Sequence, residues 1–187
     1  MAILEAYFVV PPNWADRPKV SHIWRTSIQK VITGREKRSA LFTYKRKRTA
    51  YSTIAMYRSE LVWVEAMFFK YLHYQWGFPI WPDKAILSAA GNIGDNSLTV
   101  ETTIYRRFEV GDECILIDKT NCRTYEVQTI SGITLNQISL VGLLTKTWPI
   151  NSFVYPVIAS RISGDQVLSY QTDEMTEFSV DATETVE

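Results

Sequence analysis

Few residues in this chain have the type and spacing that catalysis or metal binding requires. The two histidines, His22 and His73, are far apart in the sequence, and no nucleophile motif such as Gly-x-Ser-x-Gly occurs. Structural zinc sites take four ligands at short spacings, and the chain offers no such set. We therefore expect no enzymatic activity, no metal site and no cofactor.

Two other patterns could suggest chemistry but do not carry it. The adjacent carboxylates Asp112-Glu113 and Asp173-Glu174 would point to opposite faces of a strand, so we interpret them as solvated. The segment Gly91-Asn92-Ile93-Gly94 lacks the Gly-Lys-Ser/Thr and the following helix of a phosphate-binding loop. Neither pattern indicates a catalytic site.

The two cysteines, Cys114 and Cys122, flank a predicted turn within residues 118–121. A tight turn there would place Cys122 opposite Ile117 and Cys114 opposite Tyr125, so that the two sulfur atoms do not meet. We expect buried free thiols, as is typical of proteins made in a reducing cytoplasm.

The strongest local charge signal is the run Lys45-Arg46-Lys47-Arg48. Strand alternation sends Lys45 and Lys47 to one face and Arg46 and Arg48 to the other. Nucleic-acid binding would favour cations beside aromatic rings on one platform, which this alternation does not provide. Nucleic-acid binding is therefore less favoured but stays open, as do contact with an acidic protein surface, protection of a sheet edge, and a merely solvated strand.

The charges of the whole chain are divided between its two parts. Residues 1–84 contain 14 basic and 6 acidic residues, whereas residues 85–187 contain 6 basic and 14 acidic residues, and the net charge is zero. Opposite charge on the two parts fits either a nucleic-acid-binding basic half or packing of one subunit's basic part against another's acidic part. The division could also have no function.

The first part of the chain predicts an arm, a hairpin and a helix. Residues 1–20 contain prolines between aromatic residues, which indicates an extended arm with at most an edge strand. Residues 21–32 and 41–55 favour two strands of a long β-hairpin. Ser59 can cap a helix that starts at Glu60, and Gly77 would suit the left-handed residue at its end.

Residues 86–158 differ in kind, because short β-type runs alternate with turn residues and no helix is indicated. Five strands are predicted, over residues 97–100, 113–117, 125–130, 137–140 and 153–156. This pattern predicts a small antiparallel β-barrel inserted into another domain. That other domain would combine residues 21–85 with 159–181, and residues 182–187 would form a frayed acidic tail.

Composition limits the alternatives. The chain has 187 residues, of which 46% are hydrophobic and 21% are charged, so most of it should fold. It has no run of about 18 apolar residues, and Met1 to Glu5 lack the basic region of a secretory signal, so we expect neither a membrane contact nor secretion. The many aromatic residues favour burial against partners.

The order of features in residues 20–84 resembles the minor tail and distal tail proteins of long-tailed bacteriophages. The matching features are a hairpin turn with a basic second strand, a helix with a pair of phenylalanines, and an aromatic–proline segment. They read Gly34-x-Glu36-x-Arg38, Glu60-Leu61, Phe68-Phe69 and Phe78-Pro79-Ile80-Trp81-Pro82.

This resemblance implies a mainly β fold, a tail-tube-like β-sandwich with one flanking α-helix, in a structural virion protein. Such proteins form rings in the phage tail, with sixfold or threefold symmetry, beside the tail-tube and tail-tip proteins, and are assembled in the host cytoplasm. Direct DNA binding is not expected. The alternative is a nucleic-acid or polysaccharide-binding module that uses the small β-domain. Our candidate subunit contacts are Phe8, Trp14, Arg35, Glu36, Arg38, Lys45, Arg46, Lys47 and Arg48.

Overall fold

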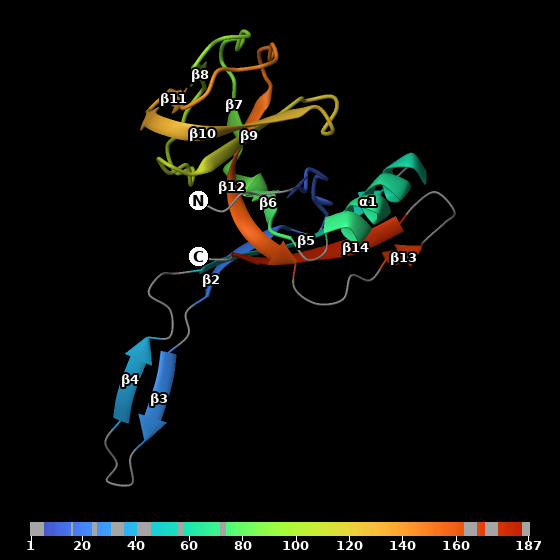
Figure 1. Cartoon of the computed structure of the whole chain (residues 1–187), viewed down its shortest axis with the longest axis vertical. Coiled ribbons are helices and arrows are strands. Elements are labelled where there is room, and N and C mark those ends of the chain that lie inside the picture. Colours follow the sequence, from blue (N-terminus) through green and yellow to red (C-terminus); the bar gives the residue numbers. More distant parts are fainter. Residues whose placement is uncertain are drawn as a thin grey trace.

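The computed structural model of the chain is mainly β, with the α-helix α1 (Arg58–Tyr71) and a short 3-10 helix η1 (Trp81–Asp83) (Figure 1). It describes residues 6–15, 17–23, 26–30, 36–40, 46–55, 58–71, 74–162, 168–170 and 176–184. The predicted mainly β fold with one α-helix is confirmed for these residues.

Twelve strands form one large sheet. Its path runs in the order β2 (Lys19–Ile23), β5 (Arg46–Ala55), β14 (Thr176–Glu184), β12 (Phe153–Ile162), β9 (Glu113–Ile117), β10 (Tyr125–Thr134), β11 (Gln137–Leu140) and β8 (Ser97–Thr99), with antiparallel neighbours throughout. Four further strands join beside the path: β1 (Ala6–Tyr7), β6 (Trp76–Pro79), β7 (Ala85–Ile86) and β13 (Leu168–Tyr170). The sheet is not closed into a barrel among the described residues.

The predicted hairpin is present as two successive pairs of strands. At its base, β2 pairs with β5, with Ile23 opposite Arg46. Further out, β3 (Thr26–Lys30) pairs with β4 (Glu36–Ala40) in a separate two-stranded sheet. We call β3 and β4 the tip hairpin. Figure 1 shows the tip hairpin projecting from the rest of the molecule, on the opposite side from α1.

Helix α1 begins at Arg58, one residue before the predicted cap Ser59, and residues 56–57 and 72–73 lie outside the described ranges. Its inward residues Leu61 and Val64 are fully buried, as the helical spacing predicts. The prediction that Gly77 ends the helix is wrong. Gly77 lies in β6 opposite Tyr7, and the aromatic ring of Tyr7 covers it.

The N-terminal arm lies on its own chain. Strand β1 pairs in parallel with β6, and the Phe8 amide donates to the Gly77 carbonyl at 2.9 Å. Thr53 Oγ1 donates to the Pro11 carbonyl at 2.6 Å, which ties the proline segment to β5. The arm is therefore held through its backbone: the Phe8 amide donates, and the Pro11 carbonyl, which a proline retains, accepts.

The strands predicted between residues 97 and 156 are all present, and β9 and β11 have the predicted bounds. The predicted register of the two cysteines is wrong. Tyr125 lies opposite Ile117, and Cys114 lies opposite Gln128. The loop is wider than a tight turn, because Asp118 Oδ1 accepts hydrogen bonds from the Thr120 and Asn121 amides and organises it.

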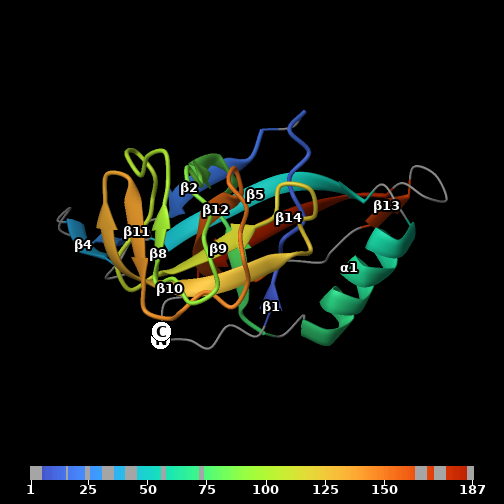
Figure 2. The same cartoon turned by 90° about the horizontal axis from the view of Figure 1, so that it is seen from above.

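Two clusters of buried side chains meet at β9. Ile115 and Ile117 belong to the cluster that contains the arm, α1 and β14, whereas Cys114 and Leu116 belong to the cluster of residues 85–154. Since successive side chains of a strand point to opposite faces, β9 contributes to both clusters. This explains its uninterrupted apolar sequence. Figure 2 shows the strands of residues 85–154 and α1 on different parts of the molecule.

Candidate functional site

Two of the predicted contact residues, Glu36 and Arg38, lie two residues apart on β4 of the tip hairpin. Glu36 lies opposite Lys30, and Arg38 lies opposite Ile28. Arg35 and Lys45 are outside the described residues. Residues 24–45 contain six basic residues and one acidic residue. The described strands of the tip hairpin read Thr-Ser-Ile-Gln-Lys and Glu-Lys-Arg-Ser-Ala, so they contain little apolar material.

The basic run at the base of the hairpin is engaged within the chain. Lys47 Nζ lies 3.2 Å from Glu109 Oε1, and Arg48 holds Asp181 through two nitrogen atoms, with Nε 2.7 Å from Oδ1. These contacts join the basic first part of the chain to its acidic second part. Reversing the charge of Lys47 or Arg48 would therefore disturb the fold as well as any surface.

The two aromatic residues predicted for subunit contact have different surroundings. Phe8 is fully buried, and its ring lies 5.8 Å from that of Phe78 and 6.1 Å from that of Phe178 between centroids. It could reach a neighbouring chain only if the arm left its place. Trp14 is 61% exposed and remains available for contact.

Glu109, Asp112 and Glu184 interact with Lys47 where β5, β9 and β14 meet, and Glu113 adjoins Asp112. Glu184 Oε2 accepts the Lys47 amide at 2.6 Å, and Glu113 Oε2 accepts the Tyr7 hydroxyl at 2.8 Å. Asp112 interacts electrostatically with Lys47 and with two of the other carboxylates. We call this set the acidic seam; its members are Glu109, Asp112, Glu113 and Glu184.

The acidic seam is crowded with negative charge. Burial raises the pKa of Asp112, the positive charge of Lys47 opposes the shift, and Glu109 and Glu184 add to it. Burial also raises the pKa of Glu113, against the hydrogen bond from Tyr7 and together with the charge of Asp112. Both carboxylates would therefore be stabilised in their ionised form by a further cation.

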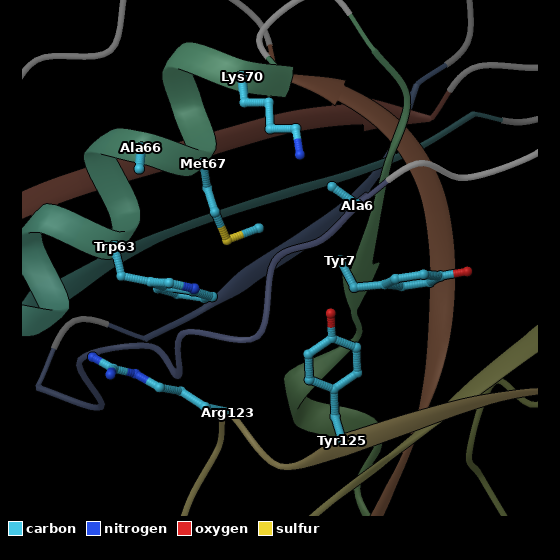
Figure 3. A pocket seen from close by; sticks show the side chains of 8 residues that line it. All are labelled: Ala6, Tyr7, Trp63, Ala66, Met67, Lys70, Arg123 and Tyr125. Atoms are coloured by element: carbon cyan, nitrogen blue, oxygen red, sulfur yellow. The ribbon is translucent and has the colours of Figure 1, made fainter. Parts of the chain in front are cut away.

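A groove of about 370 Å³ lies between α1 and the wall made by β1 and β10. Figure 3 shows Trp63 and Met67 projecting from α1 on one side, with Tyr7 and Tyr125 on the other. Arg123 lies over the Trp63 ring, with its guanidinium carbon 5.5 Å from the ring centroid. The groove is thus aromatic with cationic side chains at its rim, and its described lining contains no carboxylate.

The described residues contain no group of three or more histidine, cysteine or acidic side chains arranged to hold a metal ion. Both cysteines are free, as predicted, with Cys114 buried and Cys122 partly buried. Burial, followed by the charge of Glu113, raises the pKa of Cys114 to about 12. The Cys114 thiol is therefore unsuited to act as a nucleophile at neutral pH.

Neither the acidic seam nor the groove is evident from the sequence. The seam combines residues 109–113 with Glu184, and the groove combines Tyr7, Trp63 and Tyr125 from three distant segments. In the sequence, only the adjacent acids Asp112-Glu113 point to an acidic site. The alternation of side chains along a strand favours a solvated interpretation of that pair instead. The sheet connections that bring these segments together are long-range.

Comparison with known proteins adds no relative. No protein-family model matches the chain, and no curated protein matches it significantly. Within the described ranges, no helix has the length and apolarity needed to span a bilayer.

Proposed function

We propose that this chain is a structural virion protein that assembles into a ring in the tail of a long-tailed bacteriophage, through contacts between copies. Its position would be the distal tail, the baseplate or the tail tip. We also propose the detailed architecture, which is a tail-tube-like β-sandwich with a small β-barrel inserted at residues 86–158. It rests on the sequence resemblance together with the tip hairpin.

The tip hairpin carries the proposal. A two-stranded hairpin is at best marginally stable in water, because it has too few apolar contacts to offset the entropy lost on ordering it. Among the described strands, β3 and β4 pair only with each other, and they project from the body. Ile28 is the one large apolar residue in their sequences. Such an element is expected where a neighbouring molecule completes it.

The test is assembly of the full chain with and without the tip hairpin. We expect size-exclusion chromatography with light scattering and negative-stain images to show closed rings or a concentration-dependent oligomer. In the variant, residues 26–40 are replaced by a short Gly-Ser linker. We expect it to keep the circular dichroism of the sheet and to remain monomeric.

Equal assembly of the full chain and the folded variant would contradict the role of the hairpin. A full chain that stays monomeric at every concentration tested would contradict self-assembly. A matched control exchanges Lys119 and Arg161, both exposed and outside the hairpin, for serine. This control should assemble like the unmodified chain.

A second function is favoured by the groove beside α1. Aromatic rings with cations at the rim suit the stacking of a sugar or a nucleobase, and Arg123 and Tyr125 come from the segment that the binding-module alternative uses. Titration with single-stranded DNA and with oligosaccharides would test it. Binding that disappears in Trp63→Ala would favour this function, and for single-stranded DNA the binding should weaken steeply with salt. Such binding by a full chain that stays monomeric would favour it over ring formation.

A further inference from the structure

The tip hairpin and the acidic seam have opposite charge but lie apart on one chain. The tip hairpin is part of residues 24–45, whose net charge is strongly positive, and Figure 1 shows it directed away from the body. In the acidic seam, Glu109, Asp112 and Glu184 interact with Lys47, and Glu113 interacts with Asp112. Figure 1 shows the tip hairpin apart from β5, β9 and β14, the strands that carry Lys47, Glu113 and Glu184.

We propose that the tip hairpin of one copy docks on the acidic seam of a second copy. This inference rests on the proposed self-assembly and identifies which two surfaces meet. Lys30, Lys37 and Arg38 would supply the cations, and Glu109 and Asp112 would supply the carboxylates.

The state of the seam supports this choice of partner. Glu113 and Glu184 are already engaged, the first by the Tyr7 hydroxyl and the second by the Lys47 amide. Glu109 pairs with Lys47 Nζ at 3.2 Å but its side chain is 62% exposed, and Asp112 receives no side-chain hydrogen bond from any described residue. Burial is the main cause of the raised pKa of Asp112, and the charges of Glu109 and Glu184 add to it. A further cation beside Glu109 and Asp112 would stabilise their ionised forms.

The geometry also requires two different surfaces. A hairpin that meets a seam is a heterologous contact, in which each copy gives one surface and receives the other. Repetition of such a contact builds a closed ring or a helical filament. A symmetric contact of hairpin against hairpin would instead bring like charges together and would be repulsive.

The test is a charge exchange in the full chain. The hairpin variant is Lys30→Glu with Lys37→Glu and Arg38→Glu, and the seam variant is Glu109→Lys with Asp112→Lys. We expect each variant alone to associate at least about tenfold more weakly than the unmodified chain in sedimentation velocity at low salt. A mixture of the two should recover association, because every hairpin then meets a seam of opposite charge.

Three controls keep the test decisive. Arg17→Glu with Lys119→Glu and Arg161→Glu makes the same change in net charge on exposed residues elsewhere, and should leave association unchanged. Circular dichroism reports whether each variant folds. If Asp112→Lys prevents folding, Glu109→Gln with Asp112→Asn replaces it and should still weaken association.

The outcomes separate this inference from the proposed function. Assembly that is lost in the hairpin variant and retained in the folded seam variant would overturn the seam as partner and leave ring formation standing. Loss of assembly in the control variant, or no recovery in the mixture, would also overturn the inference. An unmodified chain that is monomeric even at low salt would overturn both proposals.

Discussion

Gly77 lets the N-terminal arm lie against the sheet. The substitution Gly77→Ala adds one methyl group there and tests how closely the arm packs on β6. A Cβ at Gly77 would lie within 2.5 Å of Tyr7 Cε1 and 3.1 Å from Val157 Cγ1. The Tyr7 ring cannot withdraw freely, because its hydroxyl donates to Glu113 at 2.8 Å and its ring contacts that of Tyr125. Gly77→Ala must therefore strain the arm or break this hydrogen bond.

The magnitude follows from these two alternatives. Overpacking a well-packed site typically costs about 1–3 kcal/mol, and losing a hydrogen bond to a charged group costs about 1.5–3 kcal/mol. We expect Gly77→Ala to lower the free energy of unfolding by about 2 kcal/mol. In a Tyr7→Ala background the clash is absent, so the same substitution should cost less than about 1 kcal/mol, the remainder coming from Val157.

Urea denaturation followed by tryptophan fluorescence and by circular dichroism measures both values. Gly132→Ala is the matched control, because its Cβ would meet Ser139 at an ordinary distance of 3.6 Å. It should change stability by less than about 0.5 kcal/mol. The reasoning is refuted if Gly77→Ala is as stable as the unmodified chain, or if its cost is unchanged when Tyr7 is alanine.

The remaining predictions concern Phe8, Glu126 and the two cysteines. Phe8→Ala should destabilise the chain by about 3–5 kcal/mol in the same urea assay, because it empties a fully buried position. Glu126 accepts hydrogen bonds from Trp148 Nε1 at 2.9 Å and from the Thr145 amide at 2.7 Å, so Glu126→Ala should cost about 3 kcal/mol. Burial alone would raise the pKa of Glu126, but the hydrogen bonds from Trp148, Thr145 and Gln128 outweigh it and lower the pKa. The free energy of unfolding of the unmodified chain should therefore exceed that of Glu126→Gln by its full amount above about pH 5. The difference should shrink as pH falls through the lowered pKa, and urea titrations across pH 3–7 would measure it. Cys122 should react with a thiol reagent before Cys114 in the folded chain, and equal rates would contradict the burial of Cys114.

The strands could be predicted from sequence wherever turn residues bound a short apolar run. Glu113–Ile117 and Gln137–Leu140 have the predicted bounds because glycine, asparagine and aspartate punctuate them clearly. The pairing of Cys114 could not be predicted, since the width of the 118–124 loop depends on hydrogen bonds to Asp118. The prediction for Gly77 is wrong because a glycine that follows a helix can have another role. Here its missing side chain leaves room for the Tyr7 ring.

The candidate site could be predicted from the sequence only where its residues are close together in the chain. The hairpin could be predicted from residues 21–55. The strands pair antiparallel both at its base, β2 with β5, and at its tip, β3 with β4. The burial of Phe8 depends on β6 and β14, which no local pattern places beside the arm. The contacts of Lys47 with Glu109 and of Arg48 with Asp181 likewise need the complete sheet order.

Strand β12 has a consequence for any attempt to trim the molecule. Its first residues pair with β7 and β9, and its later residues pair with β6 and β14. One continuous strand therefore contributes both to the part formed by residues 85–154 and to the part that contains the arm and β14. Strand β9, encoded within residues 86–158, also supplies Ile115 and Ile117 to the cluster that surrounds the arm. Excising that segment would uncover the aromatic interior of what is left, so evolution could remodel its outer loops but could not simply discard it.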